Sequence, residues 1–177
     1  DHYFDHILVI DDSLSGKFQN KVVGTYRLNR GLKKNLFYTS SEFNIQSLVD
    51  FDGNILELGR SCVHINYRNG KTMQLLWKFI AQYVIKHNIK IMFGCASFPG
   101  TNIEKFASTL AYLNKKYLAP LHIRPFALET RAVKFKKDIN NPKSFKEFLS
   151  SIPPLIKGYI RLGAFIGDGV VADYSNT

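Results

Sequence analysis

The chain has 177 residues, of which 45% are hydrophobic and 14% aromatic, and this composition excludes an intrinsically disordered protein. The 24 Lys and Arg residues outnumber the 14 Asp and Glu residues, so the formal net charge is +10. Such a charge favours an acidic partner, which could be nucleic acid, an anionic membrane surface or an acidic protein, unless the lysines only solvate the surface.

Apolar patterning predicts a mixed α/β protein. Alternation predicts strands at 6–10 and 21–28, paired as a hairpin, and a third strand at 55–65. Apolar residues spaced by three and four predict a long helix at 71–87, buried on most of its sides. The remaining predicted elements are a short helix at 41–50, a strand at 90–98, a helix at 103–118, a strand at 124–133, a short helix at 142–150 and a last strand at 158–165.

The length suits a single domain over 1–177. Because the chain starts at Asp1 and enters a strand almost at once, we expect it to be a piece of a longer protein. No apolar run reaches the ~18–20 residues that span a bilayer, and no signal peptide is visible, so we expect a cytoplasmic protein. Cys62 and Cys95 lie in apolar segments and are predicted to be reduced core residues.

The predicted strand at 55–65 carries two charges, Glu57 and Arg60. A charged pair in a core-like strand is costly to bury unless the charges are paired or used. Strict alternation would place them on opposite faces, but Gly59 could mark a β-bulge that brings both to one face. The pair is therefore either functional or a buried structural ion pair.

A basic loop follows this strand and opens the long helix. It reads Arg68-Asn-Gly-Lys71, with Gly70 just before the helix. The free N–H groups and the dipole of a helix N-terminus favour a phosphate there. The alternative is an ordinary helix cap with exposed basic side chains.

Several motifs, in order along the chain, resemble one family. They are Phe37 with Ser-Glu-Phe at 41–43, Leu-Glu-Leu-Gly-Arg-Ser-Cys-Val at 56–63, Tyr-Arg at 67–68, Leu-Trp at 76–77, Phe-Gly-Cys-Ala-Ser-Phe at 93–98 and Pro-Pro-Leu-Ile-Lys-Gly-Tyr-Ile-Arg-Leu-Gly-Ala at 153–164. Together they are similar to the ornithine-acyl-carrier-protein N-acyltransferases, often labelled hemolysin-like, of the GNAT superfamily.

The resemblance implies an α/β GNAT acyltransferase fold: a mixed, mostly antiparallel sheet with a splayed parallel central pair, flanked by helices. It also implies that 1–177 forms a single GNAT-like domain that lacks N-terminal and C-terminal parts of the full-length protein. The implied reaction moves a fatty acyl or 3-hydroxy fatty acyl group from the phosphopantetheine of acyl-carrier protein to the α-amine of ornithine. The product would be a lyso-ornithine lipid.

The resemblance also implies roles for particular residues. Glu57 would hold the amine or accept its proton, and Arg60 would bind a carboxylate or the donor. The side chains that would contact the donor are Arg68, Gly70 and Lys71 at the phosphate, and Ser97 at the acyl chain. Arg161 and Asp173 would shape the acceptor site. A turn-capping role for Ser97, and solvated or structural roles for Arg161 and Asp173, stay open.

We expect no tightly bound cofactor and no metal, because the five His residues show no ligand spacing. The implied partners are an acidic acyl-carrier protein, the amino acid acceptor and, at the periphery, the anionic inner membrane. The alternative enzyme is a long-chain N-acyl amino acid synthase or an acyl-homoserine lactone synthase. A basic nucleic-acid-binding module is disfavoured because the aromatic residues fall at core spacing.

Overall fold

The computed structural model describes residues 3–32, 37–135 and 145–172. The chain divides into two compact units, Asp1–Tyr38 with Phe51–Cys95 and Thr39–Asp50 with Ala96–Thr177, and each is considered by itself. The single domain over 1–177 stays a prediction.

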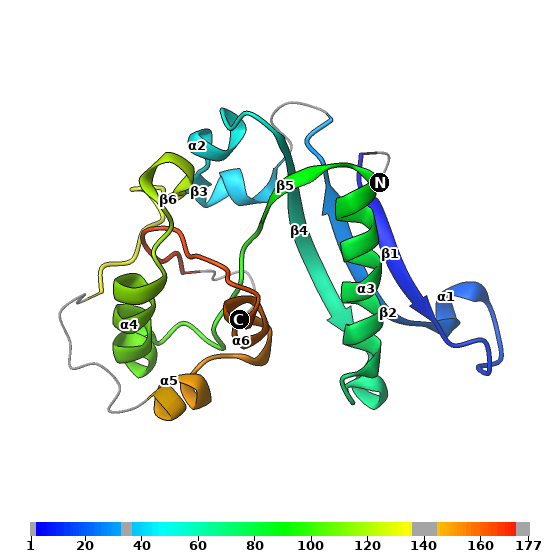
Figure 1. The fold of residues 1–177 in the computed structure, drawn as a ribbon. Helices are drawn as coiled ribbons and strands as arrows, with labels where there is room; N and C mark the ends of the chain where they lie inside the picture. Colours follow the sequence, from blue (N-terminus) through cyan, green and yellow to red (C-terminus); the bar gives the residue numbers. More distant parts are fainter. Residues whose placement is uncertain (1–2, 33–36, 136–144, 173–177) are drawn as a thin grey trace. The chain divides into compact units, whose positions relative to one another are not determined.

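The first unit is built on a four-stranded sheet (Figure 1). Its strands, in spatial order, are β1 (Asp5–Ile10), β2 (Val22–Asn29), β4 (Asn54–Val63) and β5 (Ile89–Phe93). β1, β2 and β4 pair antiparallel, whereas β4 and β5 pair parallel. The predicted hairpin of β1 and β2 is therefore confirmed, with the short helix α1 (Phe18–Lys21) in its connection.

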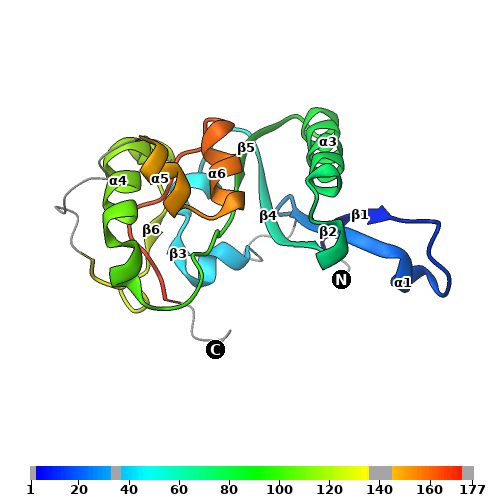
Figure 2. The same ribbon diagram turned by 90° about the horizontal axis from the view of Figure 1, so that it is seen from below.

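Helix α3 (Lys71–Lys86) packs on one face of this sheet (Figure 2). Its buried residues recur every fourth position, so they form one stripe that enters the core beside Tyr26 and Leu56. The helix predicted at 71–87 is confirmed to within one residue. Burial on most sides is wrong, because Leu75 is 43% and Phe79 is 46% exposed.

The parallel pair separates after four residue pairs. The last pair is Glu57 with Phe93, and β4 then continues to Val63. At the next position, a Cβ on Gly94 would lie 2.2 Å from the carbonyl oxygen of Leu58. The strand predicted at 90–98 thus ends five residues early, at Phe93. A mixed, mostly antiparallel sheet with a splayed parallel pair is the fold class that the sequence predicted, although β5 is an edge strand of the four-stranded sheet.

The second unit is mainly helical. Its core residues Leu113, Phe148 and Ile152 pack with surrounding aromatic rings, among them Tyr112. Its elements are β3 (Phe43–Asn44), α2 (Gln46–Val49), α4 (Ala107–Tyr117), β6 (Phe126–Ala127), α5 (Phe145–Ser151) and α6 (Pro154–Arg161), and β3 pairs with β6. Of the short 3-10 helices, Ile65–Tyr67 belongs to the first unit, Ile103–Phe106 and Leu121–Ile123 belong to the second, and Tyr38–Ser41 begins at the last residue before the second unit.

One element predicted for the second unit is wrong and two are shorter than predicted. No strand forms at 158–165: residues 158–161 belong to helix α6, which starts where Pro154 supplies a preset helical φ. The strand at 124–133 is reduced to β6, because the N–H groups of Arg131 and Ala132 both bond to the carbonyl of Leu128 in a turn. The helix at 41–50 is reduced to α2. The helix predicted at 142–150 corresponds to α5, and 142–144 lie outside the described residues.

Neither cysteine is a core residue. Cys62 and Cys95 are exposed, so the predicted burial is wrong. Within the described ranges, we find no helix with both the length and the apolar character needed to cross a bilayer.

Because Gly94 lies against the carbonyl of Leu58, we expect a methyl group at position 94 to destabilise the fold. Gly94→Ala should lower the free energy of unfolding by about 1–3 kcal/mol, since a backbone carbonyl occupies the space a Cβ needs. Gly158→Ala is the control, because nothing lies within 4 Å of its added Cβ and alanine favours the helix. Thermal unfolding of both variants tests this, and equal stability of Gly94→Ala and the wild type would contradict it.

Candidate active site

Strand β4 contains a β-bulge just after the point where it leaves β5. Arg27 of β2 pairs with Gly59 and Thr25 pairs with Cys62, so two residues of β4, Arg60 and Ser61, oppose one residue of β2. Arg60 has a φ of 50°, in the left-handed region. The predicted bulge is confirmed one residue beyond Gly59. A bulge bends a strand and increases its twist, which is common beside active sites.

Glu57 is the last residue of β4 that pairs with β5, and it is 2% exposed. Its Oε2 accepts hydrogen bonds from the backbone N–H of Tyr38 at 3.1 Å and from Nδ2 of Asn29 at 3.4 Å. These donors hold the carboxylate at the point where the two parallel strands separate. A buried carboxylate in a fixed position can orient an amine or accept its proton.

Arg60 lies three residues further along β4 and is exposed. It makes no salt bridge with Glu57, although both residues are described. The alternative of a buried structural ion pair is therefore wrong. The catalytic roles of Glu57 and Arg60 stay predictions.

The loop between β4 and α3 has a local frame of hydrogen bonds. Arg68 donates from Nε to the carbonyl of Val63 at 3.0 Å, and Oδ1 of Asn69 accepts from the N–H of Lys71 at 3.1 Å. Gly70 has a φ of 89°, and nothing lies within 4 Å of the position of its missing Cβ. The loop therefore presents open space at the N-terminus of a 16-residue helix, where an anion is favoured.

Sequence reasoning did not single out Asn29 or Asn69. Asn69 stands two residues before the helix, a spacing at which an Asn side chain often bonds to the backbone, so a local signal existed. Asn29 contacts Glu57 across 28 residues of sequence, and no local pattern predicts that contact.

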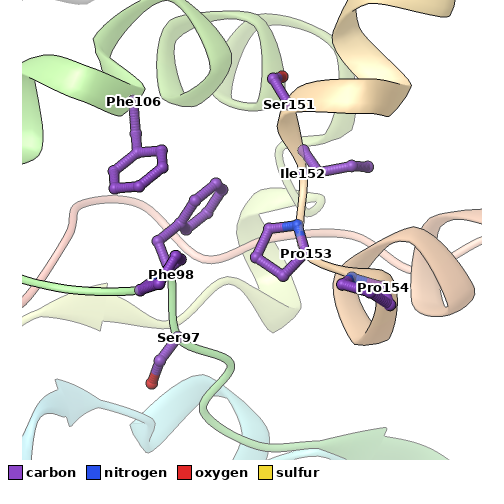
Figure 3. Close-up of a pocket in the computed structure, with 8 residues that line it drawn as sticks. Ser97, Phe98, Phe106, Ser151, Ile152, Pro153 and Pro154 are labelled. Atoms are coloured by element: carbon purple, nitrogen blue, oxygen red, sulfur yellow. The ribbon is translucent and has the colours of Figure 1, made fainter. Parts of the chain in front are cut away.

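The other predicted site residues belong to the second unit. Ser97 is exposed, lies beyond the end of β5 and lines a largely apolar cavity of about 510 Å³ (Figure 3). The cavity is also lined by Phe98, Pro99, Phe106, Ser151, Ile152, Pro153 and Pro154. Arg161 is the exposed last residue of α6. Asp173 lies outside the described residues.

A splayed parallel pair, a bulged strand and a basic loop before a long helix define the class of the first unit as a GNAT acyltransferase fold. A family model described as "Acetyltransferase (GNAT) domain" matches residues 1–78. Among the described residues, no group of three or more His, Cys, Asp or Glu side chains could hold a metal ion.

Comparison with curated relatives identifies the family within this class. Proteins named L-ornithine N(alpha)-acyltransferase are 41% identical over 180 residues in Agrobacterium fabrum, 42% over 178 in Brucella abortus and 37% over 179 in Rhodobacter capsulatus. The alignments cover 99%, 96% and 98% of this chain, and 61%, 62% and 67% of the respective relatives. The chain belongs to the L-ornithine Nα-acyltransferase family of the GNAT superfamily. It spans about three fifths of the length of the first two of these relatives.

The position of Glu57 predicts a catalytic effect that is separate from folding. Glu57→Gln keeps the shape of the side chain and can still accept from Asn29 and Tyr38, so the protein should stay folded. Turnover in acyl transfer should fall by ~10²-fold or more, because the amide is not a base.

Arg60→Ala is the companion variant, and it should raise a substrate KM because it removes the exposed guanidinium that we expect to bind a carboxylate or the donor. Steady-state kinetics and thermal unfolding are measured on both variants. Normal turnover in both would remove Glu57 and Arg60 from the catalytic machinery.

The open space at the loop predicts that loop variants weaken binding of the acyl donor and leave binding of ornithine unchanged. Lys71→Ala removes a charge, and loss of one charge-assisted hydrogen bond costs about 1.5–3 kcal/mol, or roughly ten- to a hundredfold in affinity. Gly70→Val should raise the donor KM comparably, since it strains a left-handed position and fills the open space.

Matched controls exist for both loop variants. Lys78→Ala removes an exposed charge from the same helix, and Gly100→Val alters another glycine with a positive φ, 77°, and open space around it. Both controls should leave the donor KM unchanged. An unchanged donor KM in Lys71→Ala and Gly70→Val would reduce the loop to a helix cap.

Proposed function

We propose that the protein transfers a fatty acyl group from a thioester to the α-amine of ornithine, giving a lyso-ornithine lipid. The observation that carries this proposal is the buried, hydrogen-bonded carboxylate of Glu57 at the splay of β4 and β5. The names of the relatives, L-ornithine N(alpha)-acyltransferase, support the choice of acceptor and of the atom acylated.

The proposed chemistry is aminolysis of the thioester. The neutral α-amine attacks the thioester carbonyl carbon and a C–N bond forms. The C–S bond then breaks, and the proton lost by the amine passes to the leaving thiolate, which departs as the pantetheine thiol. An α-amine has a pKa near ~8, so a carboxylate that orients it and accepts its proton is a sufficient base. Glu57 is the residue we assign to this step.

The tetrahedral intermediate carries an oxyanion, which needs hydrogen-bond donors fixed in advance. Beyond Glu57, no strand among the described residues pairs with β4 on the side where β5 lay. Backbone N–H groups on that edge of β4 can therefore donate to the thioester carbonyl oxygen or to the pantetheine amides. The bulge at Arg60 alters the direction of these groups.

We assign the donor to acyl-carrier protein in preference to acyl-CoA. The net charge of +10 complements an acidic carrier protein, and the loop before α3 has one glycine, which suits a single phosphate. Arg68, Gly70 and Lys71 would meet that phosphate, and Ser97 would contact the acyl chain. Arg161 and Asp173 would contact the acceptor. The same charge suits a cytoplasmic protein that touches the anionic inner membrane.

Product analysis tests the reaction and the donor together. Incubation with L-ornithine and a 3-hydroxyacyl-carrier protein should give an amide at the α-nitrogen, identified by tandem mass spectrometry. kcat/KM should be higher with acyl-carrier protein than with acyl-CoA, and it should fall as ionic strength rises because association is steered by charge.

The control donor is the acyl-pantetheine thioester, which lacks both the carrier protein and the phosphate. Its kcat/KM should depend little on salt. Failure to form an ornithine amide from any donor would reject the proposed reaction, whereas equal or better use of acyl-CoA would reject only the assigned donor.

A further inference from the structure

The loop that precedes α3 is tied to a distant segment by one side-chain hydrogen bond. The hydroxyl of Tyr67 donates to Oδ2 of Asp11 at 2.6 Å, across 56 residues of sequence. Asp11 follows the last residue of β1, and Tyr67 is the last residue of the 3-10 helix Ile65–Tyr67. The bond therefore joins the β1–β2 connection to the residue just before Arg68.

Asp11 is itself held firmly in place. Its Oδ1 accepts from the N–H of Ser13 at 2.9 Å and from the Ser13 hydroxyl at 2.6 Å. Its own N–H donates to the carbonyl of Lys21 at 2.9 Å. Asp11 is therefore a fixed point on the connection, to which Tyr67 attaches.

Both groups keep the protonation states that this bond requires. The hydrogen bonds from Ser13 and Tyr67 hold the pKa of Asp11 below its usual value, so its carboxylate is ionised at neutral pH. The bond to Asp11 raises the pKa of Tyr67, so its hydroxyl stays protonated. A neutral hydroxyl donating to an ionised carboxylate makes a short, strong hydrogen bond.

The turn that carries Tyr67 leads straight into the loop. The N–H of His64 bonds to the carbonyl of Val23 at 2.9 Å, which fixes the start of the turn on β2. The N–H of Tyr67 bonds to the carbonyl of His64 at 2.8 Å, which closes the turn. The hydroxyl of Tyr67 then fixes the end of the turn, immediately before the residues Arg68–Lys71.

We propose that Asp11 and Tyr67 are positioning residues for the donor-binding loop: they hold the backbone of residues 68–71 in the conformation that receives the donor phosphate. This inference rests on the proposed function, because it takes that loop to be the donor site. Neither residue touches the donor, and each acts through Arg68, Gly70 and Lys71.

If the bond between Tyr67 and Asp11 served only to stabilise the fold, a different result is expected. A second bond of the same kind in this chain provides the control. Tyr83 donates its hydroxyl to Oδ2 of Asp5, so the same two residue types form the same bond. Tyr83 lies near the C-terminus of α3, at the end of the helix far from the loop. If such bonds served stability alone, loss of either one would have similar effects.

Four variants separate these roles. Tyr67→Phe and Asp11→Asn should each raise the donor KM by about tenfold, equivalent to loss of one hydrogen bond to a charged group, with the ornithine KM unchanged. Tyr83→Phe should leave both KM values unchanged. Asp12→Asn should do the same, because its side chain is 92% exposed and it removes the same charge one residue away.

The two residues should also act as one unit. The variant Asp11→Asn with Tyr67→Phe should be no worse than the more impaired single variant, since Tyr67→Phe already removes the donor, and Asp11→Asn leaves one uncharged oxygen for two partners that bond to separate carboxylate oxygens. An additive donor KM effect would overturn the inference, as would an unchanged donor KM in Tyr67→Phe. Lack of activity in the wild type would instead count against the proposed function.

Amide hydrogen exchange tests the inference independently of enzyme activity. Amides of residues 68–73 should exchange faster in Tyr67→Phe than in the wild type, and at the wild-type rate in Tyr83→Phe. Unchanged exchange of these amides in Tyr67→Phe, or the same acceleration in Tyr83→Phe, would overturn the proposal even if the enzyme used another donor or acceptor.

Discussion

The close approach of Gly94 to the carbonyl of Leu58 is the constraint on which the candidate site depends. Where β4 and β5 remain paired, the edge of β4 is used by the sheet, and beyond Glu57 no strand among the described residues pairs with β4 on that side. Pairing ends at Glu57 and Phe93, so the buried carboxylate sits at that transition. The bulge at Arg60 follows three residues further along β4. Position in the strand thus places an acid, the end of the parallel pairing and a bend together.

The parts of the fold with strong periodicity could be predicted from sequence. The stripe of buried residues on α3 and the alternation in β1 and β2 each reflect packing on a single face, which a local pattern records. The apolar run at 158–165 is too short to show a helical or a strand period, so it fits a strand and a buried helix equally well. Pro153 and Pro154 were the signal for α6, since proline is favoured at the start of a helix.

The residues of the candidate site also fall into two groups, those with a local sequence signal and those without one. Glu57, Gly70 and the bulge were accessible from the sequence, since a charge in an apolar strand and a glycine before a helix are local anomalies. Asn29 and Asp11 were not, because their importance lies in contacts made across 28 and 56 residues. The exposure of Cys62 was missed for a related reason: alternation along β4 changes at the bulge, so positions beyond it do not continue the pattern before it.

Arg60 adopts a left-handed backbone conformation that a glycine would adopt without strain. For a residue with a Cβ this conformation costs about 1–2 kcal/mol, and here neither burial nor a salt bridge offsets the cost. A design that sought stability alone would place glycine at this position. The strand is therefore strained at an exposed arginine, so the sequence keeps this side chain at a cost in stability that glycine would avoid.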